Sequence, residues 1–315
     1  MIPTVAVRGL LLATVLLASC SEPPAPAVQR QAPSDVDFLA DNAVWRTQRR
    51  EALLAPDGWT SLVGLHWLEL KSHYIGSGTG SGIVLEVGPP KLGLVQQQGD
   101  KVYFTPERGV MVTADGQPLK RRIRLVDDQS GQPTVIGFSG GADQMTLIHR
   151  GERYGLRIKS ADAAARLQFT QIDYYTPSPA WRIEGHFTPS PAGTTLTFVD
   201  MVGNTVAAPS PGVVSFEHDG KSYQLTAMEG DEGGLFFVLA DRTSGHGSYP
   251  AGRFLDTAAP AADGTVTLDF NRAYNPPCVF TRFATCPLPP AQNRLDLTID
   301  AGEKMYTGPV GGESS

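Results

Sequence analysis

Hydrophobic residues recur at helical spacing mainly near the start of the chain. Phe38, Trp45 and Ala52 follow one another at intervals of seven, which places them on one side of a helix. Ser34, with Asp37 three positions later, provides a helix start of the capping-box kind, and the turn residues 56–58 provide a stop. The pattern therefore predicts an N-terminal helix over residues 35–57.

After residue 58 the apolar positions come in short runs, several of them alternating with polar residues. Gly, Pro, Asn and Asp separate these runs, as in Asp115-Gly116 and Asp219-Gly220. Short runs of this kind are typical of β-strands joined by tight turns. The predicted strands are 82–87, 101–105, 109–113, 145–149, 154–159, 181–187, 195–199, 213–217, 222–227 and 234–240.

Strands that follow one another without intervening helices favour sandwiches or barrels over βαβ units. The proline-containing stretch 174–179 is the best candidate for a boundary. We predict a mainly β protein with one N-terminal helix and two packed lobes that resemble β-sandwiches or barrels. The first lobe spans 58–175, the second 176–306, and a flexible tail follows over 307–315.

The chain begins with the pattern of a signal peptide over residues 1–19: one arginine, a short apolar run and then small residues. Leu17-Ala18-Ser19-Cys20 resembles the lipobox of bacterial lipoproteins, and the resemblance implies a lipid anchor on Cys20. Residues 20–34 are rich in Pro and Ala and predict an extended tether. Because Ser21 rather than Asp follows Cys20, the resemblance also implies the outer membrane, with the protein facing the periplasm.

Charge and motifs exclude several classes of function. The formal net charge is -6, so no basic surface favours nucleic acid as a partner. The one basic run, 120–124, includes an apolar residue and favours a strand with a solvated face over a phosphate-binding patch. No serine-hydrolase elbow, zinc-protease motif, phosphate loop or dinucleotide fingerprint occurs, and the six histidines are dispersed. We expect no cofactor and no metal site.

Residues 269–290 combine five prolines, two cysteines and several aromatic residues. Helices and central strands do not accept so many prolines, and linkers lack large apolar groups, so we predict an ordered loop fixed to a folded body. We call these residues the Pro-rich loop. Two cysteines left in an oxidising compartment predict a disulfide between Cys278 and Cys286. A zinc site and a thiolate nucleophile at Cys278 remain open alternatives.

Four stretches of the sequence resemble the bacterial domain-of-unknown-function family 1684 (DUF1684): 56–68, 252–255, 269–280 and 286–295. The similarity extends over residues 41–305, and the lipobox marks the chain as a lipoprotein member. The family brings no established activity, so the resemblance implies no reaction. Members without a leader would lie in a reducing cytoplasm, where a disulfide does not persist.

The first functional hypothesis is a binding site for a small anionic or polar ligand of the cell envelope. It would lie where the Pro-rich loop meets residues 241–255, with the guanidinium of Arg253 presenting donors to a carboxylate or similar acceptor. The candidate ligand-binding residues are Asp241, Thr243, His246, Tyr249, Arg253, Asp269, Asn271, Tyr274 and Asn275.

Two alternatives remain. A hydrolase of an envelope component would use His246 or Asp241 as base and Arg253 to stabilise an anionic intermediate. A purely structural or interaction role would make Arg253 and Asp269 a buried ion pair, with the asparagines bonding turn backbone. An acid or base next to a second polar group in a cleft would favour the enzyme, whereas a groove lined mainly by aromatic residues would favour binding.

Overall fold

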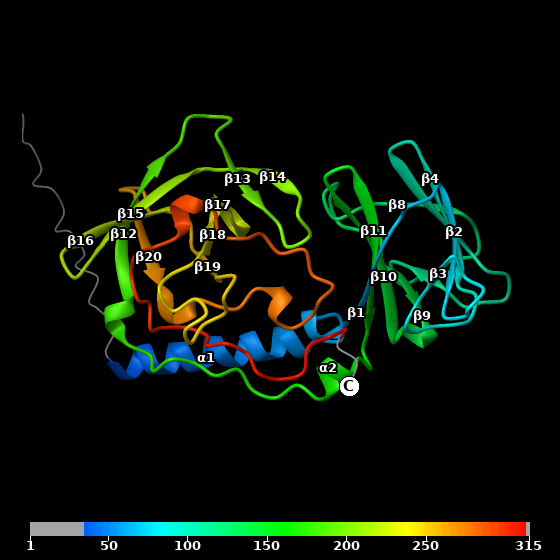
Figure 1. The fold of residues 1–315 in the computed structure, drawn as a ribbon, viewed down its shortest axis with the longest axis horizontal. Helices are drawn as coiled ribbons and strands as arrows, with labels where there is room; N and C mark the ends of the chain where they lie inside the picture. The colour runs from blue at the N-terminus through cyan, green and yellow to red at the C-terminus, as the bar shows by residue number, and fades with distance from the viewer. Residues whose placement is uncertain (1–34, 313–315) are drawn as a thin grey trace, which may run out of the picture.

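The computed structural model describes residues 35–312, which form two β-rich lobes side by side (Figure 1). The predicted mainly β fold with one long N-terminal helix is confirmed, and within residues 35–312 no sheet closes into a barrel. No helix in this range is long and apolar enough to cross a membrane. The signal peptide, Cys20 and the tether lie outside the described residues.

The first lobe packs two sheets around one core. Nearly all neighbouring strands are antiparallel, and the core contains Ile75, Phe104, Met145 and Leu156. One sheet has the order β1 (Leu62–Trp67), β11 (Arg153–Ser160), β10 (Asp143–Arg150), β9 (Ile136–Phe138), β6 (Thr113–Ala114) and β7 (Gln117–Pro118). The other has the order β3 (Ile83–Val84), β2 (Ser72–Gly76), β4 (Gly93–Gln98), β5 (Lys101–Pro106) and β8 (Ile123–Leu125).

The second lobe is built from three smaller sheets around a core that includes Trp181, Phe237, Leu255 and Phe270. The four-stranded sheet has the order β16 (Lys221–Thr226), β15 (Gly212–His218), β12 (Arg182–Pro189) and β20 (Thr265–Asp269). The three-stranded sheet has the order β17 (Met228–Glu229), β18 (Leu235–Leu239) and β19 (Arg253–Thr257). A hairpin joins β13 (Thr195–Val199) to β14 (Thr205–Pro209).

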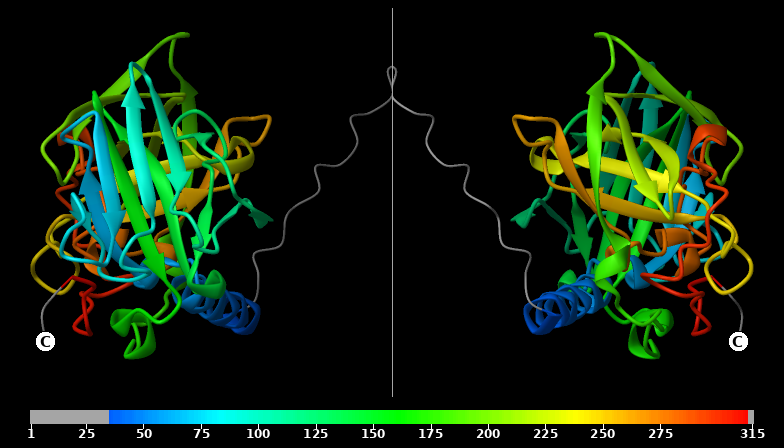
Figure 2. Two further views of the ribbon diagram at one scale, coloured as in Figure 1. Left: turned by 90° about the vertical axis from the view of Figure 1, so that its right-hand side faces the viewer. Right: turned by 90° about the vertical axis from the view of Figure 1, so that its left-hand side faces the viewer.

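Helix α1 (Asp35–Leu54) precedes the first lobe in the sequence but packs against the second. In both side views of Figure 2 it lies at the base of the molecule, below the strands. Leu53 is buried there against Val279 and Phe280 of the Pro-rich loop. Helix α1 therefore packs under the second lobe and contributes to its core.

Two further segments run along this base. After β11 and the short helix α2 (Ala164–Leu167), the chain crosses to the second lobe, and Tyr174 of this crossing stacks edge-on against Trp45 of α1. At the other end, Gly311 exchanges backbone hydrogen bonds with Phe280 and Arg282. Within the predicted flexible tail, Gly311 is therefore paired with the Pro-rich loop.

The strand predicted at 109–113 is wrong, and that at 82–87 shrinks to β3. Gly109 has a φ of 84°, which turns the chain out of an extended path. The following residues form an irregular segment in which Met111 is 86% exposed. Alternating apolar residues alone could not distinguish this segment from a strand.

Candidate functional site

The Pro-rich loop is ordered, and Asp269 and Asn271 bond to groups within the protein. Its backbone forms 3-10 turns at Phe270–Arg272 and Pro277–Val279. Asp269 accepts from the backbone N–H and the side-chain amide of Asn271, at 3.1 and 2.9 Å. The Asn271 amide also exchanges two hydrogen bonds of 2.9 Å with the backbone of Ser178. These two candidate residues therefore shape the loop and hold it to the crossing segment.

Arg253 is fully buried, and its guanidinium bonds to groups that are distant in the sequence. Nη2 donates to Asp241 Oδ2 at 2.8 Å and to the carbonyl of Ile299 at 2.9 Å, while Nη1 donates to the carbonyl of Ala301. The interpretation that Arg253 pairs with Asp269 is wrong, because Arg253 pairs with Asp241, whereas Asp269 lies 3.5 Å from Arg272 Nε. With its charge neutralised and no exposed surface, Arg253 does not reach a ligand.

The other candidates are dispersed. Asp241 and Thr243 are buried beside Arg253, where the Asp241 carboxylate accepts from the Thr243 N–H at 2.7 Å. Asn275 donates its backbone N–H to the buried Glu303 and its side chain to the carbonyl of Lys304. His246 is exposed. A site made jointly by these residues is not assembled.

Cys278 and Cys286 carry free thiols and contact each other. The N–H of Cys278 donates to Cys286 Sγ at 3.1 Å. The hydrogen bond between the two thiols lowers the pKa of Cys278, and Tyr249 contributes a second one; the same thiol contact, together with burial, raises the pKa of Cys286. The predicted disulfide is not formed in this structure. Among residues 35–312, no three His, Cys, Asp or Glu side chains converge as a metal site would require.

Of the candidate residues, Tyr274 lines a cavity that we call the aromatic pocket. This cavity of about 500 Å³ lies between α1, the Pro-rich loop and strands β18 and β19. Four of its residues come from one face of α1, at helical spacing. Its lining consists of Trp45, Gln48, Arg49, Ala52, Trp59, Phe236, Phe254, Asp256, Tyr274 and Pro277.

Four polar side chains, Gln48, Arg49, Asp256 and Tyr274, lie among these aromatic rings, and three of them contact one another. The Tyr274 hydroxyl donates to Asp256 Oδ2 at 2.7 Å, and the guanidinium of Arg49 lies over the Tyr274 ring, 4.6 Å from its centroid. Partial burial raises the pKa of Asp256, and the hydrogen bond from Tyr274 opposes that shift. Burial and the neighbouring Asp256 raise the pKa of Tyr274 above its ordinary range, so the phenol stays protonated.

Arg49 is fixed by two contacts outside the pocket. Its Nε donates to Oε1 of the fully buried Glu303 at 2.9 Å, and its Nη2 donates to the carbonyl of Asn275 at 2.8 Å. Glu303 accepts the backbone N–H of Asn275 at 2.7 Å with its other oxygen. The ion pair therefore holds α1, the Pro-rich loop and the C-terminal segment in one arrangement around the pocket.

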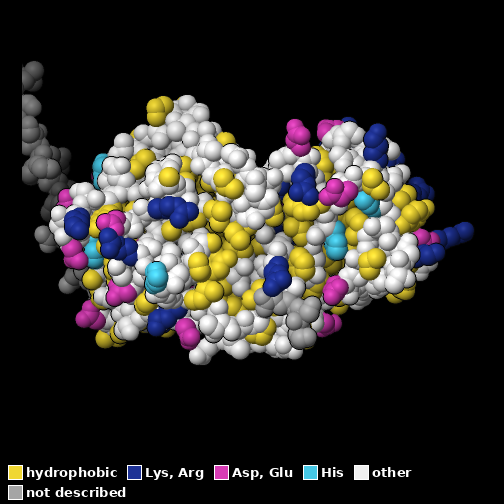
Figure 3. Space-filling view, viewed as in Figure 1, with side chains coloured by type: hydrophobic (Ala, Val, Ile, Leu, Met, Phe, Trp, Pro, Cys, Tyr) yellow, Lys and Arg dark blue, Asp and Glu magenta, His cyan; other side chains and the backbone are white. Residues whose placement is uncertain are grey.

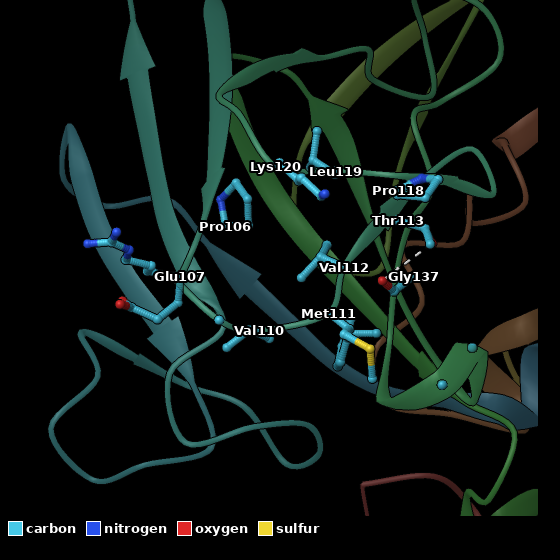
Figure 4. Close-up of a pocket in the computed structure, with 15 residues that line it drawn as sticks. Pro106, Glu107, Val110, Met111, Val112, Thr113, Pro118, Leu119, Lys120 and Gly137 are labelled. Carbon is cyan, nitrogen blue, oxygen red and sulfur yellow. Dashed lines mark hydrogen bonds between the residues drawn. The ribbon is translucent and has the colours of Figure 1, made fainter.

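A larger cavity, of about 800 Å³, opens in the first lobe beside the irregular segment 106–113 (Figure 4). Val110, Met111, Val112 and Leu119 contribute an apolar lining, and the Thr113 hydroxyl donates to the carbonyl of Gly137 at 3.5 Å. Size alone favours this cavity, but the chemistry of the aromatic pocket makes the latter the better candidate site.

Sequence reasoning missed most of the aromatic pocket. The spacing of Trp45 and Ala52 predicts that they share one side of a helix, but it gives no role to Arg49 between them. Phe254 and Asp256 share one face of β19, while Arg253 and Leu255 point to the other, so this strand carries a charged residue on each face. A charged residue on each face of one short strand is the sequence signal that could have indicated a polar group at this position. Figure 3 shows hydrophobic side chains gathered across the middle of one face, over part of the Pro-rich loop.

Comparison with known proteins identifies a family but no activity. Residues 167–304 match a family model described as "Protein of unknown function (DUF1684)". Six chains among the solved structures match; one is the solution NMR structure of an uncharacterized protein of Haloarcula marismortui. It is 32% identical, with 44% of this chain and 78% of that chain covered, and its TM-score of 0.37 supports no structural argument. No curated protein matches.

Replacement of Arg253 tests the buried ion pair. We expect Arg253→Met to lower the free energy of unfolding by about 3 to 5 kcal/mol, because the Asp241 carboxylate would remain buried without its partner. Arg242→Met is the matched control, because the ion pair of Arg242 with Asp296 is exposed and its loss costs about 1 kcal/mol or less. Urea unfolding followed by far-UV circular dichroism measures both; equal losses would contradict a structural role specific to Arg253.

Proposed function

Because the chain belongs to the DUF1684 family, which is described without an activity, we propose a function from the geometry of its own site: the aromatic pocket binds a small polar ligand. The single observation that carries this proposal is the set Arg49, Asp256 and Tyr274 in a cavity walled by aromatic rings. Small-molecule sites typically combine apolar walls with a few polar groups that fix orientation.

The aromatic walls would supply most of the contact area. Trp45, Trp59, Phe236, Phe254 and Tyr274 line the pocket, and flat rings of this kind pack well against planar or ring-shaped ligands. A volume of about 500 Å³ falls within the range of roughly 300 to 1,000 Å³ found for such sites. The pocket is therefore sized for a single small molecule.

The polar groups would select the ligand by hydrogen bonds. Arg49 has five N–H donors, of which Glu303 and Asn275 occupy two. Asp256 has one oxygen bonded to Tyr274 and a second oxygen without a hydrogen bond among residues 35–312. Donors and acceptors thus stand together, as a ligand with hydroxyl, amide or carboxylate groups requires.

A hydrolase remains the second candidate because of one observation. Asp256 has a raised pKa and lies within hydrogen-bond distance of Tyr274, as expected of an acid or base in a cleft. The ten lining residues of the pocket include no Ser, Thr, Cys or His that could act as nucleophile or second base. This composition favours binding over hydrolysis.

We further propose that the ligand is a component of the cell envelope. The support is the N-terminal sequence, where Leu17-Ala18-Ser19-Cys20 resembles a lipobox and a Pro/Ala-rich stretch follows. A lipid on Cys20 would keep the two lobes near the membrane surface, at the outer membrane facing the periplasm. A pocket for a small polar molecule would then face the periplasmic solutes.

The anchor predicts the behaviour of one variant. Cells fed a clickable fatty acid should label the wild-type protein, and Cys20→Ser should lose the label because the acceptor sulfur is removed. In-gel fluorescence after click chemistry measures this, with Cys278→Ser as matched control. Equal labelling of wild type and Cys20→Ser would remove the proposed anchor.

The contact between Cys278 and Cys286 predicts an oxidised pair in the envelope. The thiols already meet, so a disulfide needs little rearrangement, and it would contribute about 2 to 3 kcal/mol for a loop this short. Alkylation of freshly denatured envelope extract without reductant should therefore leave both cysteines unmodified. Mass spectrometry that finds two alkylated thiols would show that the pair stays reduced.

The pocket predicts which side chains a ligand depends on. Purified full chain should be screened with sugars, amino acids and organic acids of the envelope, using the fluorescence of the tryptophans, two of which line the pocket. For any ligand found, Asp256→Asn and Tyr274→Phe should each weaken binding about tenfold or more, since they alter polar contacts worth roughly 1.4 kcal/mol or more. Tyr223→Phe, on β16 outside the pocket, is the control. If neither Asp256→Asn nor Tyr274→Phe changes the affinity of a ligand, that ligand binds outside the aromatic pocket.

A further inference from the structure

The side of the first lobe that faces the second carries a row of basic residues. Strands β10 and β11 stand at the junction of the lobes in Figure 1. Arg150 ends β10, and Arg157 and Lys159 lie on β11. Leu156 and Ile158 alternate with them and point into the core of the lobe, so Arg157 and Lys159 point toward the junction.

Arg150 is neutralised within the protein. Its two terminal nitrogens bond both oxygens of Asp128, at 3.0 and 2.7 Å, and its Nε donates to the Thr285 hydroxyl of the Pro-rich loop at 3.0 Å. Both carboxylate oxygens of Asp128 are thereby engaged in a bidentate pair with Arg150. The charge of Asp128 also acts on the neighbouring Arg157, but no ion pair joins Asp128 to Arg157.

Arg157 has no such partner. Its Nε is buried without a hydrogen bond, and none of the ion pairs formed within residues 35–312 includes this residue. Arg46, Arg253 and Arg272 also have an unbonded Nε, but each is held through its other nitrogens. The guanidinium of Arg157 contacts the Trp59 ring, 5.1 Å from its centroid. Burial lowers the pKa of Arg157, the neighbouring Arg150 adds to that shift, and the charge of Asp128 offsets only part of it.

Lys159 adds a second positive charge beside the same ring. Its Nζ lies 5.8 Å from the Trp59 centroid and donates to the backbone carbonyl of Asp57. It forms no ion pair among residues 35–312, and the Asp57 side chain is exposed. Two half-buried cations therefore share one indole ring, and neither forms an ion pair among residues 35–312, although the charges of Asp57 and Asp128 act on them from further away.

We propose that Arg157, Lys159 and Trp59 form a binding site for a small oxyanion, a phosphate or carboxylate group, at the junction of the lobes. A half-buried cation without a counter-ion destabilises the fold, and contact with an aromatic ring compensates for only part of that cost. An oxyanion would supply the missing acceptors for the planar guanidinium and the ammonium. Trp59 also lines the aromatic pocket, so the two sites are neighbours, but neither cation lines that pocket.

Titration with inorganic phosphate tests the site. In the purified full chain, phosphate should raise the melting temperature and change the tryptophan fluorescence, and Arg157→Met should weaken the phosphate affinity at least tenfold. Without phosphate, Arg157→Met should melt about 2 °C higher than wild type, because it removes an uncompensated cation. A role limited to packing would predict a lower melting temperature instead.

A matched control lies on the same strand. Arg153 also stacks on a tryptophan, Trp67, at 4.3 Å, but it is paired with Glu69, so Arg153→Met should leave the phosphate response unchanged. Lys159→Met should weaken the affinity without changing the fold, which keeps the test independent of the Arg157 variant. Phosphate that acts equally on wild type and on Arg157→Met, or does not act on wild type at all, would overturn the site.

Glycerol 1-phosphate, as a second probe, separates two sources of the same chemistry. Tighter binding of glycerol 1-phosphate than of inorganic phosphate, lost in Arg157→Met, would assign a phosphate ester such as a lipid headgroup. Tighter binding of inorganic phosphate would assign a free anion. Failure of the aromatic pocket variants to affect a pocket ligand would leave these results unchanged, so the two proposals can fail separately.

Discussion

The second lobe depends on the buried ion pair between Arg253 and Asp241. Arg253 belongs to β19, and its guanidinium also collects the carbonyls of Ile299 and Ala301, so the C-terminal segment is held against the strand. That segment delivers Glu303 to a fully buried position. Because a buried charge is tolerated only with partners, Glu303 in turn fixes Arg49 of α1 and the backbone of Asn275.

The aromatic pocket is a consequence of this chain of contacts. Arg253 faces inward on β19, so Phe254 and Asp256 face the other way, toward α1. Glu303 bonds both Arg49, which lies over the Tyr274 ring, and the backbone N–H of Asn275. These two bonds fix the position of the Pro-rich loop relative to α1. The groups that would meet a ligand are thus positioned by residues that a ligand does not touch.

The arginines of this protein differ in how their charges are compensated. Arg253, Arg49 and Arg150 each have a carboxylate within hydrogen-bond distance, and each joins segments that are distant in the sequence. Arg157 lies near Arg150, contacts the ring of Trp59 and forms no ion pair among residues 35–312. Because burial of a cation without an ion pair costs free energy, the pair Arg157 and Lys159 is the place where we propose that an external oxyanion supplies the partner.

The sequence by itself determined the elements whose signals are local. Spacing of apolar residues indicated the N-terminal helix and most strands, and prolines with aromatic residues indicated that residues 269–290 are an ordered loop, because φ restriction and the need to bury rings act within a few residues.

Only the tertiary structure decided that α1 packs under the second lobe, that Arg253 pairs with Asp241 rather than Asp269, and that Trp59, Asp256 and Arg49 meet around one pocket. Several carboxylates could pair with Arg253 as far as sequence shows. Arg253 pairs with the carboxylate that is buried next to it. Which carboxylate that is follows from contacts between residues far apart in the chain.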